Sequence, residues 1–226
     1  MTLPESASDG NQPVVCVFCG SKPGAGPKHL AAARNLAQTF HEHGIKLVYG
    51  GGTVGIMGEL ARTLVSLSGP DAVHGIIPAP LVAYEQGTDA NNPAVGNVID
   101  EAVYGRTTVV KDMHTRKQMM AQEVIAGGSG SGFVAMSGGY GTLEEIMEIT
   151  TWNQLGIHDR GVIMFNVDGY WDGIMQWIRT AVSSEFITPV NGGIVVEARN
   201  TDDVVTALRD YKNSEGRLNL QWTAEG

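Results

Sequence analysis

The residues best suited to chemistry lie in the stretch Ser137-Gly-Gly-Tyr-Gly-Thr-Leu-Glu-Glu145. It joins an apolar run, residues 132–136, to a segment with helical spacing. Glycines let the main chain approach a ligand closely, and the start of a helix offers unpaired N–H groups with partial positive charge. Together these features predict a phosphate-binding loop. Two carboxylates, Glu144 and Glu145, follow it directly.

A structural explanation of the same residues competes with this one. Thr142 and Glu145 form the pattern T-x-x-E, which is the capping box of a helix that has Thr at its N-cap and Glu at its third position. Glu144 is then a first-turn carboxylate that the helix dipole favours. The residues alone favour this capping interpretation over a catalytic one.

A second segment, Met113-His-Thr-Arg-Lys117, places Arg116 and Lys117 in the middle of a predicted helix. Such residues usually lie on a solvated face. Met119 and Met120 follow closely, however, which favours a buried or interfacial helix, where a charge needs a partner. The sequence shows no set of residues with the spacing of metal ligands, so we expect no metal site.

Two further glycine-bearing loops, at residues 19–26 and 50–58, each follow a predicted strand. Residues 50–55 satisfy G-x-G-x-x-G, but no acidic residue stands at the end of the next strand to hold a ribose, which argues against NAD. No G-K-[ST] motif is present either, which argues against a P-loop hydrolase. Cys16 and Cys19 lie inside a predicted buried strand and are interpreted as core residues.

Strands and helices are predicted to alternate along the chain. Periodicity predicts strands at 14–19, 45–49, 72–77, 132–136, 161–166 and 193–198, and helices at 27–43, 55–68, 107–125, 142–155, 170–184 and 201–212. Residues 78–105 are expected to be mostly irregular. The alternation predicts an α/β fold, a doubly wound, Rossmann-like parallel sheet with helices on both faces. Ligands bind such sheets at the carboxyl ends of the strands.

Composition limits the functional classes. The 226 residues are expected to form a single domain, 1–226, in which 1–12 and 213–226 are flexible tails. The net charge of −9 argues against a nucleic-acid partner. The N-terminus lacks the features of a signal peptide and no apolar run could span a membrane, so we expect a cytoplasmic protein.

The chain resembles the LOG ("lonely guy") family, cytokinin riboside 5′-monophosphate phosphoribohydrolases that are often mislabelled lysine decarboxylases. The likeness covers roughly residues 14 to 185. It is carried by Tyr49-Gly-Gly-Gly-Thr-Val-Gly-Ile-Met-Gly58, Met113-His-Thr-Arg-Lys117, Ser137-Gly-Gly-Tyr-Gly-Thr-Leu-Glu-Glu145 and Thr151-Trp-Asn-Gln-Leu-Gly-Ile-His-Asp159.

The resemblance implies hydrolysis of the N-glycosidic bond of an N6-modified AMP, with Arg116 and Glu145 as catalytic residues and no cofactor. The remaining positions that it assigns to substrate binding are Ser21, Glu85, Lys117, Gly138, Gly139, Tyr140, Gly141, Thr142, Leu143, Glu144 and Thr151. Glycine-loop main chain and the Thr142 hydroxyl would hold the phosphate. Glu145 would activate water or stabilise an oxocarbenium-like transition state.

One position departs from the family pattern. The glycine motif of the family normally begins with Pro, and this chain has Ser137 there. Proline would rigidify the entry to the loop, whereas serine keeps an N–H donor and adds a hydroxyl. We expect the phosphate loop to survive this change.

Other functions and a partner follow from the same resemblance. A general AMP nucleosidase and a non-enzymatic nucleotide or molybdenum-cofactor carrier are the alternatives; a carrier would have no use for the Arg116 and Glu145 pair. Family members are homodimers or larger, and the predicted helix at 107–125 together with Trp152 is the candidate interface. Ordinary core packing is the competing explanation of these residues.

Overall fold

A computed structural model describes residues 11–85, 99–218, 220 and 222 of the chain. In the described part, seven parallel strands form one sheet in the order β4-β3-β2-β1-β5-β6-β7. The strands are β1 Val14–Phe18, β2 Lys46–Tyr49, β3 Val73–Pro78, β4 Arg106–Val110, β5 Gly132–Ala135, β6 Gly161–Phe165 and β7 Val195–Ala198. The predicted α/β class is confirmed.

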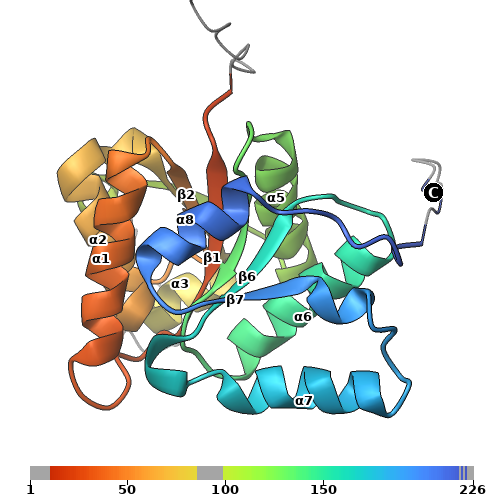
Figure 1. Cartoon of the computed structure of the whole chain (residues 1–226). Helices are drawn as coiled ribbons and strands as arrows, with labels where there is room; N and C mark the ends of the chain where they lie inside the picture. Colours follow the sequence, from red (N-terminus) through yellow and green to blue (C-terminus); the bar gives the residue numbers. More distant parts are fainter. Residues whose placement is uncertain (1–10, 86–98, 219, 221, 223–226) are drawn as a thin grey trace, which may run out of the picture.

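Helices cover both faces of this sheet (Figure 1). The α-helices are α1 Lys28–Glu42, α2 Gly55–Ser68, α3 Ala79–Glu85, α4 Glu101–Tyr104, α5 Met113–Ala126, α6 Tyr140–Gln154, α7 Asp172–Ser183 and α8 Thr201–Arg209. Short 3-10 turns are η1 Pro70–Ala72, η2 Val167–Gly169 and η3 Asn191–Gly193.

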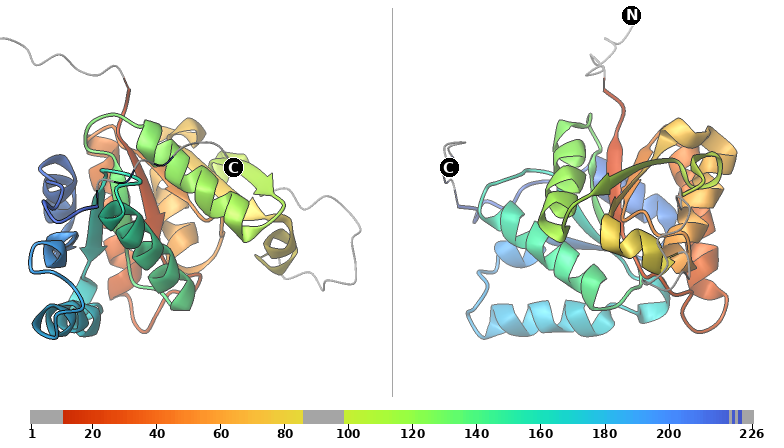
Figure 2. Two further views of the ribbon diagram at one scale, coloured as in Figure 1. Left: turned by 90° about the vertical axis from the view of Figure 1, so that its right-hand side faces the viewer. Right: turned by 180° about the vertical axis from the view of Figure 1, so that it is seen from behind.

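Each face of the sheet has its own apolar core. Leu36 of α1, Leu60 of α2 and Leu208 of α8 are buried in one core. Met120 of α5 and Ile146 of α6 are buried in the other, and the right-hand view of Figure 2 shows α5 and α6 crossing that face. Successive residues of a strand point to opposite faces, so β1 sends Val15 into the first core and Cys16 into the second.

The region between β3 and α5 differs from the prediction. Residues 106–110, whose last four were assigned to a long helix, form β4, which pairs in parallel with β3 at the edge of the sheet. The run Thr107-Thr-Val-Val110 is β-branched, which favours a strand. The helix begins later because Asp112 caps it, accepting a hydrogen bond from Thr115 N–H at 2.7 Å. Residues 79–85 and 101–104, expected to be irregular, form α3 and α4.

Segments assigned to flexible tails have specific contacts where the structure describes them. Leu218 N–H donates to Gln154 O at 2.8 Å, and Arg217 donates to the main-chain oxygens of Asn153 and His158. Gln12 O accepts from Gly128 N–H at 3.1 Å. In the structure, Gln12, Arg217 and Leu218 therefore pack against the rest of the domain. Within the part of the chain that is described, no helix has the length and apolarity that crossing a membrane requires.

Candidate active site

The candidate site lies where the order of the strands reverses. β1 sits between β2 and β5, so the chain builds one half of the sheet outward from β1 to β4 and the other half from β5 to β7. In open α/β sheets this switch point leaves a crevice at the carboxyl ends of the two central strands. The loops that follow β1 and β5 meet there.

Gly20 joins three of the predicted glycine loops. Its N–H donates to Ser137 O at 3.0 Å, and its carbonyl oxygen accepts from Ile56 N–H at 3.1 Å and from Met57 N–H at 3.3 Å. The first of these bonds reaches the loop after β5, and the other two reach the first turn of α2. Gly55 adopts φ +61°, and a side chain there would collide with the main chain of Ser21.

The start of α6 differs from the capping-box interpretation. The helix begins at Tyr140, its N-cap is Gly139, and no side chain caps it. Thr142 is therefore the third helical residue, and Glu145 lies a turn further along, so that interpretation is wrong. The glycines allow the early start, because any side chain at Gly138 would collide with the Thr142 hydroxyl.

The uncapped start leaves main-chain donors available. The first α6 residue whose N–H finds an acceptor among the described residues is Leu143, which donates to Gly139 O at 3.1 Å. The N–H groups before it are the unpaired donors that every helix N-terminus carries. Such donors, with the helix dipole behind them, can bind an anion.

Arg116 is held in place from two sides. It lies on α5, it is only 8% exposed, and its Nε donates to Ile76 O of β3 at 3.1 Å. Its guanidinium occupies the space that Gly50 leaves open, since a Cβ at Gly50 would collide with Nη2. A buried cation of this kind needs a partner.

That partner is Glu145. Arg116 Nη1 lies 3.4 Å from Glu145 Oε1, and Glu145 is 7% exposed. The two groups form an ion pair without a hydrogen bond, because Glu145 Oε1 has no hydrogen-bond partner among the described residues. Burial raises the pKa of the Glu145 carboxyl; the positive charge of Arg116 opposes this shift without cancelling it.

These groups line a cavity of about 280 Å³. Of the predicted site residues, it brings together Ser21, Arg116, Gly139, Gly141, Thr142, Glu144 and Glu145. The other residues that line it are Val17, Phe18, Cys19, Gly20, Gly50, Met57, Ile77, Leu81 and Met113. A neighbouring cavity of about 590 Å³ shares Gly20, Ser21 and Gly139 with the first, and Gly138 lines this second one.

Lys117 and Tyr140 are placed differently. Lys117 does not line the first cavity; its Nζ bonds to Glu144 at 2.6 Å and to Glu148 at 3.1 Å. Burial alone would lower the pKa of Lys117, but the hydrogen bonds to these carboxylates outweigh it, and the pKa is raised. The Tyr140 side chain is 95% exposed.

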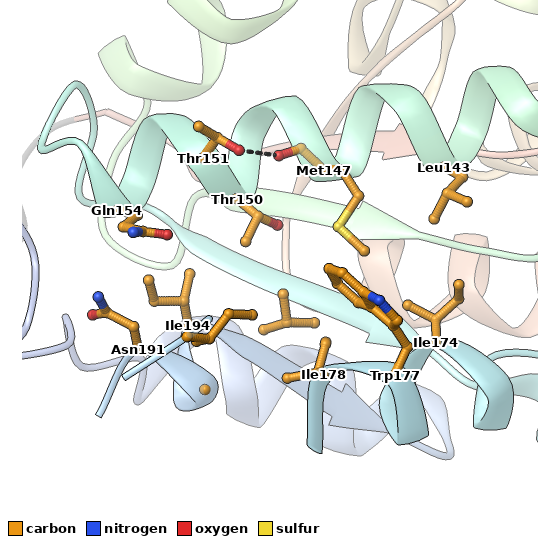
Figure 3. A pocket seen from close by; sticks show the side chains of 13 residues that line it. Leu143, Met147, Thr150, Thr151, Gln154, Ile174, Trp177, Ile178, Asn191 and Ile194 are labelled. Carbon is orange, nitrogen blue, oxygen red and sulfur yellow. Dashed lines mark hydrogen bonds between the residues drawn. The ribbon is translucent and has the colours of Figure 1, made fainter. Parts of the chain in front are cut away.

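Leu143 and Thr151 line another pocket, of about 490 Å³, between α6, α7 and η3. Figure 3 shows Leu143 and Met147 on the side of α6 that faces Trp177 and Ile178 of α7. The structure therefore does not bring these two predicted residues to the cavity of Arg116. The side chain of Glu85, the last residue of α3, lies outside the described part of the structure.

Sequence reasoning did not assign a role to Gly50, Gly20 or Ile76. The sequence predicts Gly50 only as part of a glycine-bearing loop, whereas in the structure the absence of a side chain at Gly50 makes room for the Arg116 guanidinium. Gly20 acts through its main-chain N–H and oxygen, and Ile76 acts through its main-chain oxygen. Gly20 and Gly50 share one signal in the sequence, a glycine directly after a predicted buried strand, whereas Ile76 carries none.

Cys16 and Cys19 are core residues, as expected. Both are free and buried, and they pack in opposite cores. Burial raises the pKa of both thiols, so they remain protonated. The described part of the chain holds no group of three His, Cys, Asp or Glu side chains that could bind a metal ion.

Comparison with known proteins identifies relatives along most of the chain. Residues 57–208 match the family model described as "Possible lysine decarboxylase". The chain is 51% identical over 212 residues to a "Bifunctional cytokinin biosynthesis protein" of Fusarium pseudograminearum, covering 92% of this chain but 42% of that protein. It is 39% identical over 198 residues to "Cytokinin riboside 5′-monophosphate phosphoribohydrolase LOG7" of Arabidopsis thaliana, covering 88% of this chain and 82% of that protein.

Solved structures show the same fold in more distant proteins. The molybdenum cofactor carrier protein of Chlamydomonas reinhardtii has 19% identity and a TM-score of 0.59, covering 88% of this chain and 96% of that one. A molybdenum cofactor binding protein of Rippkaea orientalis has 19% sequence identity and a TM-score of 0.56, and the match covers 89% of this chain and 98% of that one. At such identities the likeness concerns the fold alone. The family-model match over more than half of the chain and the identity with the plant LOG protein show that this chain belongs to the LOG family.

Proposed function

We propose that the chain hydrolyses the N-glycosidic bond of cytokinin riboside 5′-monophosphates, which are N6-modified AMP, and releases the free base and ribose 5-phosphate. The observation that carries this proposal is the buried Arg116–Glu145 pair in a cavity that the glycine loop also lines. The names of the plant relatives support the choice of substrate.

Main-chain donors at the start of α6 bind the phosphate in this proposal, and the hydroxyls of Ser21 and Thr142 assist. Both side chains line the cavity. Binding the phosphate there fixes the nucleotide by one end. Positioning of this kind contributes to the rate because it holds the reacting bond beside the catalytic groups.

Glu145 acts at the sugar carbon of the bond that breaks. The oxygen of water bonds to the anomeric carbon, and one proton of that water passes to the Glu145 carboxylate. The bond from the anomeric carbon to the base nitrogen breaks with its electron pair passing to the base, which then takes up the proton from Glu145. The transition state carries positive charge on the sugar, which the Glu145 carboxylate stabilises. The carboxylate also accepts a proton from the attacking water, because the oxygen that lies nearest Arg116 makes no hydrogen bond to another described residue.

Arg116 positions the Glu145 carboxylate relative to the bound nucleotide. Its Nε is already committed to Ile76 O, so the guanidinium is fixed before substrate arrives. A preorganised charge of this kind costs no reorganisation during the reaction.

Two assays in parallel test this proposal against the alternatives. The full-length chain is incubated with isopentenyladenine ribotide and with AMP, and free base and ribose 5-phosphate are separated by chromatography. The proposal expects equal amounts of both products and faster turnover of the modified nucleotide. Faster turnover of AMP would indicate a general AMP nucleosidase, and binding of nucleotide without products would indicate a carrier.

We further propose that two copies of the chain form a homodimer through the outer face of α5 and α6. Met119 and Trp152 are only partly buried there and pack against the core beneath, and Met113 and Ile125 are exposed. Met and Trp are enriched at protein interfaces. The cavity beside α5 would then lie near the second copy.

A matched pair of substitutions tests this interface. Ile125 on α5 is 37% exposed, and Leu67 on α2, which covers the opposite face of the sheet, is 36% exposed. Light scattering should give twice the 24.0 kDa chain mass for the wild type and for Leu67→Glu, and a single-chain mass for Ile125→Glu. A wild-type protein of single-chain mass would remove this proposal.

A further inference from the structure

The side chains of His29 and Tyr170 hydrogen-bond to the glycine loop at Ser137 and Gly138. Ser137 Oγ and His29 Nδ1 share a hydrogen bond of 2.9 Å, which ties the loop to the first turn of α1. The Tyr170 hydroxyl donates to Gly138 O. The rings of His29 and Tyr170 meet edge to face, with centroids 5.8 Å apart, so the two contacts form one unit.

The turn that carries Tyr170 is itself well anchored. Asp168 and Gly169 adopt positive φ angles of 54° and 77°, a conformation that is uncommon for a residue other than glycine. Lys28 Nζ lies 2.7 Å from Asp168 Oδ2, which ties the turn to the start of α1. Trp171 N–H donates to Asn166 Oδ1 at 2.7 Å. These contacts therefore hold the turn that positions Tyr170 against the loop.

The loop needs such support for a physical reason. Gly138 and Gly139 have wide conformational freedom, and ordering them costs more entropy than ordering other residues. No side chain caps α6 to fix its first turn. Proline, which begins this motif in the family that the chain resembles, would fix one dihedral angle. Ser137 leaves that angle free, so the stiffness must come from contacts.

We propose that His29 and Tyr170 are positioning residues for the phosphate loop, and that the Ser137–His29 hydrogen bond supplies the stiffness that proline would otherwise give. Neither residue lies in the cavity of Arg116 and Glu145; both line the neighbouring cavity behind Gly138 and Gly139. They act by keeping the main-chain N–H groups at the start of α6 in the arrangement that binds phosphate. The expected change in KM rests on the proposed function, whereas the expected change in the mobility of the loop does not.

The structural consequence is tested by hydrogen–deuterium exchange in peptides that span residues 137–143. His29→Ala and Ser137→Ala both remove the hydrogen bond and should speed exchange in these peptides. Ser137→Pro also removes it but restrains the main chain, and should keep exchange close to the wild-type rate. His41→Ala, an exposed histidine on the same helix, is the control and should change nothing.

The kinetic consequence is tested with isopentenyladenine ribotide as substrate. His29→Ala and Tyr170→Phe should each raise KM about 2- to 10-fold, the range that one neutral hydrogen bond supports, with little change in kcat. A loop that binds the phosphate equally in the ground state and the transition state affects KM alone. In the Ser137→Pro background, His29→Ala should have a smaller effect on KM.

The outcomes separate this inference from the proposed function. Wild-type exchange rates in His29→Ala, or exchange in Ser137→Pro as fast as in Ser137→Ala, would overturn the inference. A fall in kcat with unchanged KM would overturn it too. If the wild-type chain releases no base from any nucleotide, the proposed function fails, and the exchange rates alone decide whether the loop is held by His29.

Discussion

Glu145 combines two properties that rarely occur together in a stable protein. It is buried, and Arg116, its only ionic partner among the described residues, lies 3.4 Å from Oε1, an oxygen that accepts no hydrogen bond from these residues. A buried carboxylate in this state carries an unrecovered desolvation cost. Such a cost is common at active sites, where a group must stay reactive, and uncommon in structural ion pairs.

The pKa of Glu145 leads to a prediction about pH. Burial raises this pKa, so the carboxylate forms at a higher pH than the ordinary value of about 4.3 for glutamate. If the carboxylate is the active form, activity should fall as pH drops through the raised pKa. The measurement is kcat/KM for isopentenyladenine ribotide between pH 4 and pH 8. An acid limb at or below pH 4.3 would contradict the assignment.

Adding one methyl group at Gly50 tests whether the position of the Arg116 guanidinium matters for activity. Gly50→Ala places a Cβ against the Arg116 guanidinium, which must move away from Glu145. Because the end of an arginine side chain can shift, we expect the fold to survive and kcat/KM to fall by about tenfold or more, the effect of losing about 1.4 kcal/mol of transition-state stabilisation.

The control for this change is Gly173→Ala in α7. A Cβ at Gly173 would meet nothing within 4 Å, and alanine favours a helix over glycine. This variant should keep wild-type kinetics. Equal activity of the two variants would show that the position of Arg116 does not matter for turnover.

At the scale of elements, α5 and α6 carry the two reactive side chains, and both helices are secured at their far ends. Arg160 Nη2 donates to Ile125 O and Gly127 O at the end of α5. His158 lies beyond the end of α6, where its Nε2–H donates to Ile149 O at 2.9 Å and its Nδ1 accepts from Arg160 N–H at 3.1 Å. The contact at Nδ1 requires neutral His158, because a protonated Nδ1 cannot accept a hydrogen bond.

His158 therefore predicts a pH dependence of stability. Burial is the main reason why its pKa is lowered, and the nearby charge of Arg217 adds to the effect. A lowered pKa in the folded state means that its stabilising contribution is complete above the unfolded value, near 6.5, and is lost as pH falls through the folded value. The loss is about 1.4 kcal/mol for each pH unit between the two values.

Denaturant unfolding at pH 7 and pH 5 measures this effect. His158→Gln cannot titrate, so its unfolding free energy should fall less between these pH values than that of the wild type. His41→Gln, which changes an exposed histidine on α1, should behave as the wild type does. Equal losses in all three proteins would show that His158 does not couple pH to folding.

Elements with strong periodicity were predictable from the sequence, and those decided by neighbours were not. The helix predicted at 55–68 matches α2, Gly55–Ser68. The sequence does not reveal β4 because no glycine or proline separates its residues from the helix that follows. Its pairing with β3 also depends on residues about 30 positions earlier in the chain. The start of α6 was misplaced because the motif T-x-x-E also fits a capping box, whereas the glycines let the helix begin at Tyr140.

The site was predictable only in part. Arg116 and Glu145 are 29 positions apart, and no spacing rule joins them; the family resemblance alone suggested that they meet, as they do. The motif predicts Leu143 and Thr151 in the site, but both line the pocket between α6 and α7 instead, and Figure 3 shows the Leu143 side chain on the side of α6 that faces α7. A motif indicates which residues are close in sequence, whereas the face of a helix decides which of them reach the cavity.

At the scale of the whole molecule, the fold explains why the reactive groups meet. The chain reverses its strand order between β1 and β5, and the loops after these strands meet at one edge of the sheet. α5 comes from one half of the sheet and α6 from the other. Arg116 and Glu145 therefore face each other across the switch point. Both helices pack in the same apolar core on one face of the sheet, which keeps them in place.

The central claim is that Glu145 performs chemistry at this junction. The most direct test compares Glu145→Gln with Glu148→Gln, the same substitution on the same helix at a residue that pairs with Lys117. The measurement is the rate at which each variant releases free base from isopentenyladenine ribotide. We expect Glu145→Gln to lose about 10²- to 10⁴-fold, the range of general acid–base catalysis, and Glu148→Gln to remain within a few-fold of the wild type. Release by Glu145→Gln at the wild-type rate would contradict the claim.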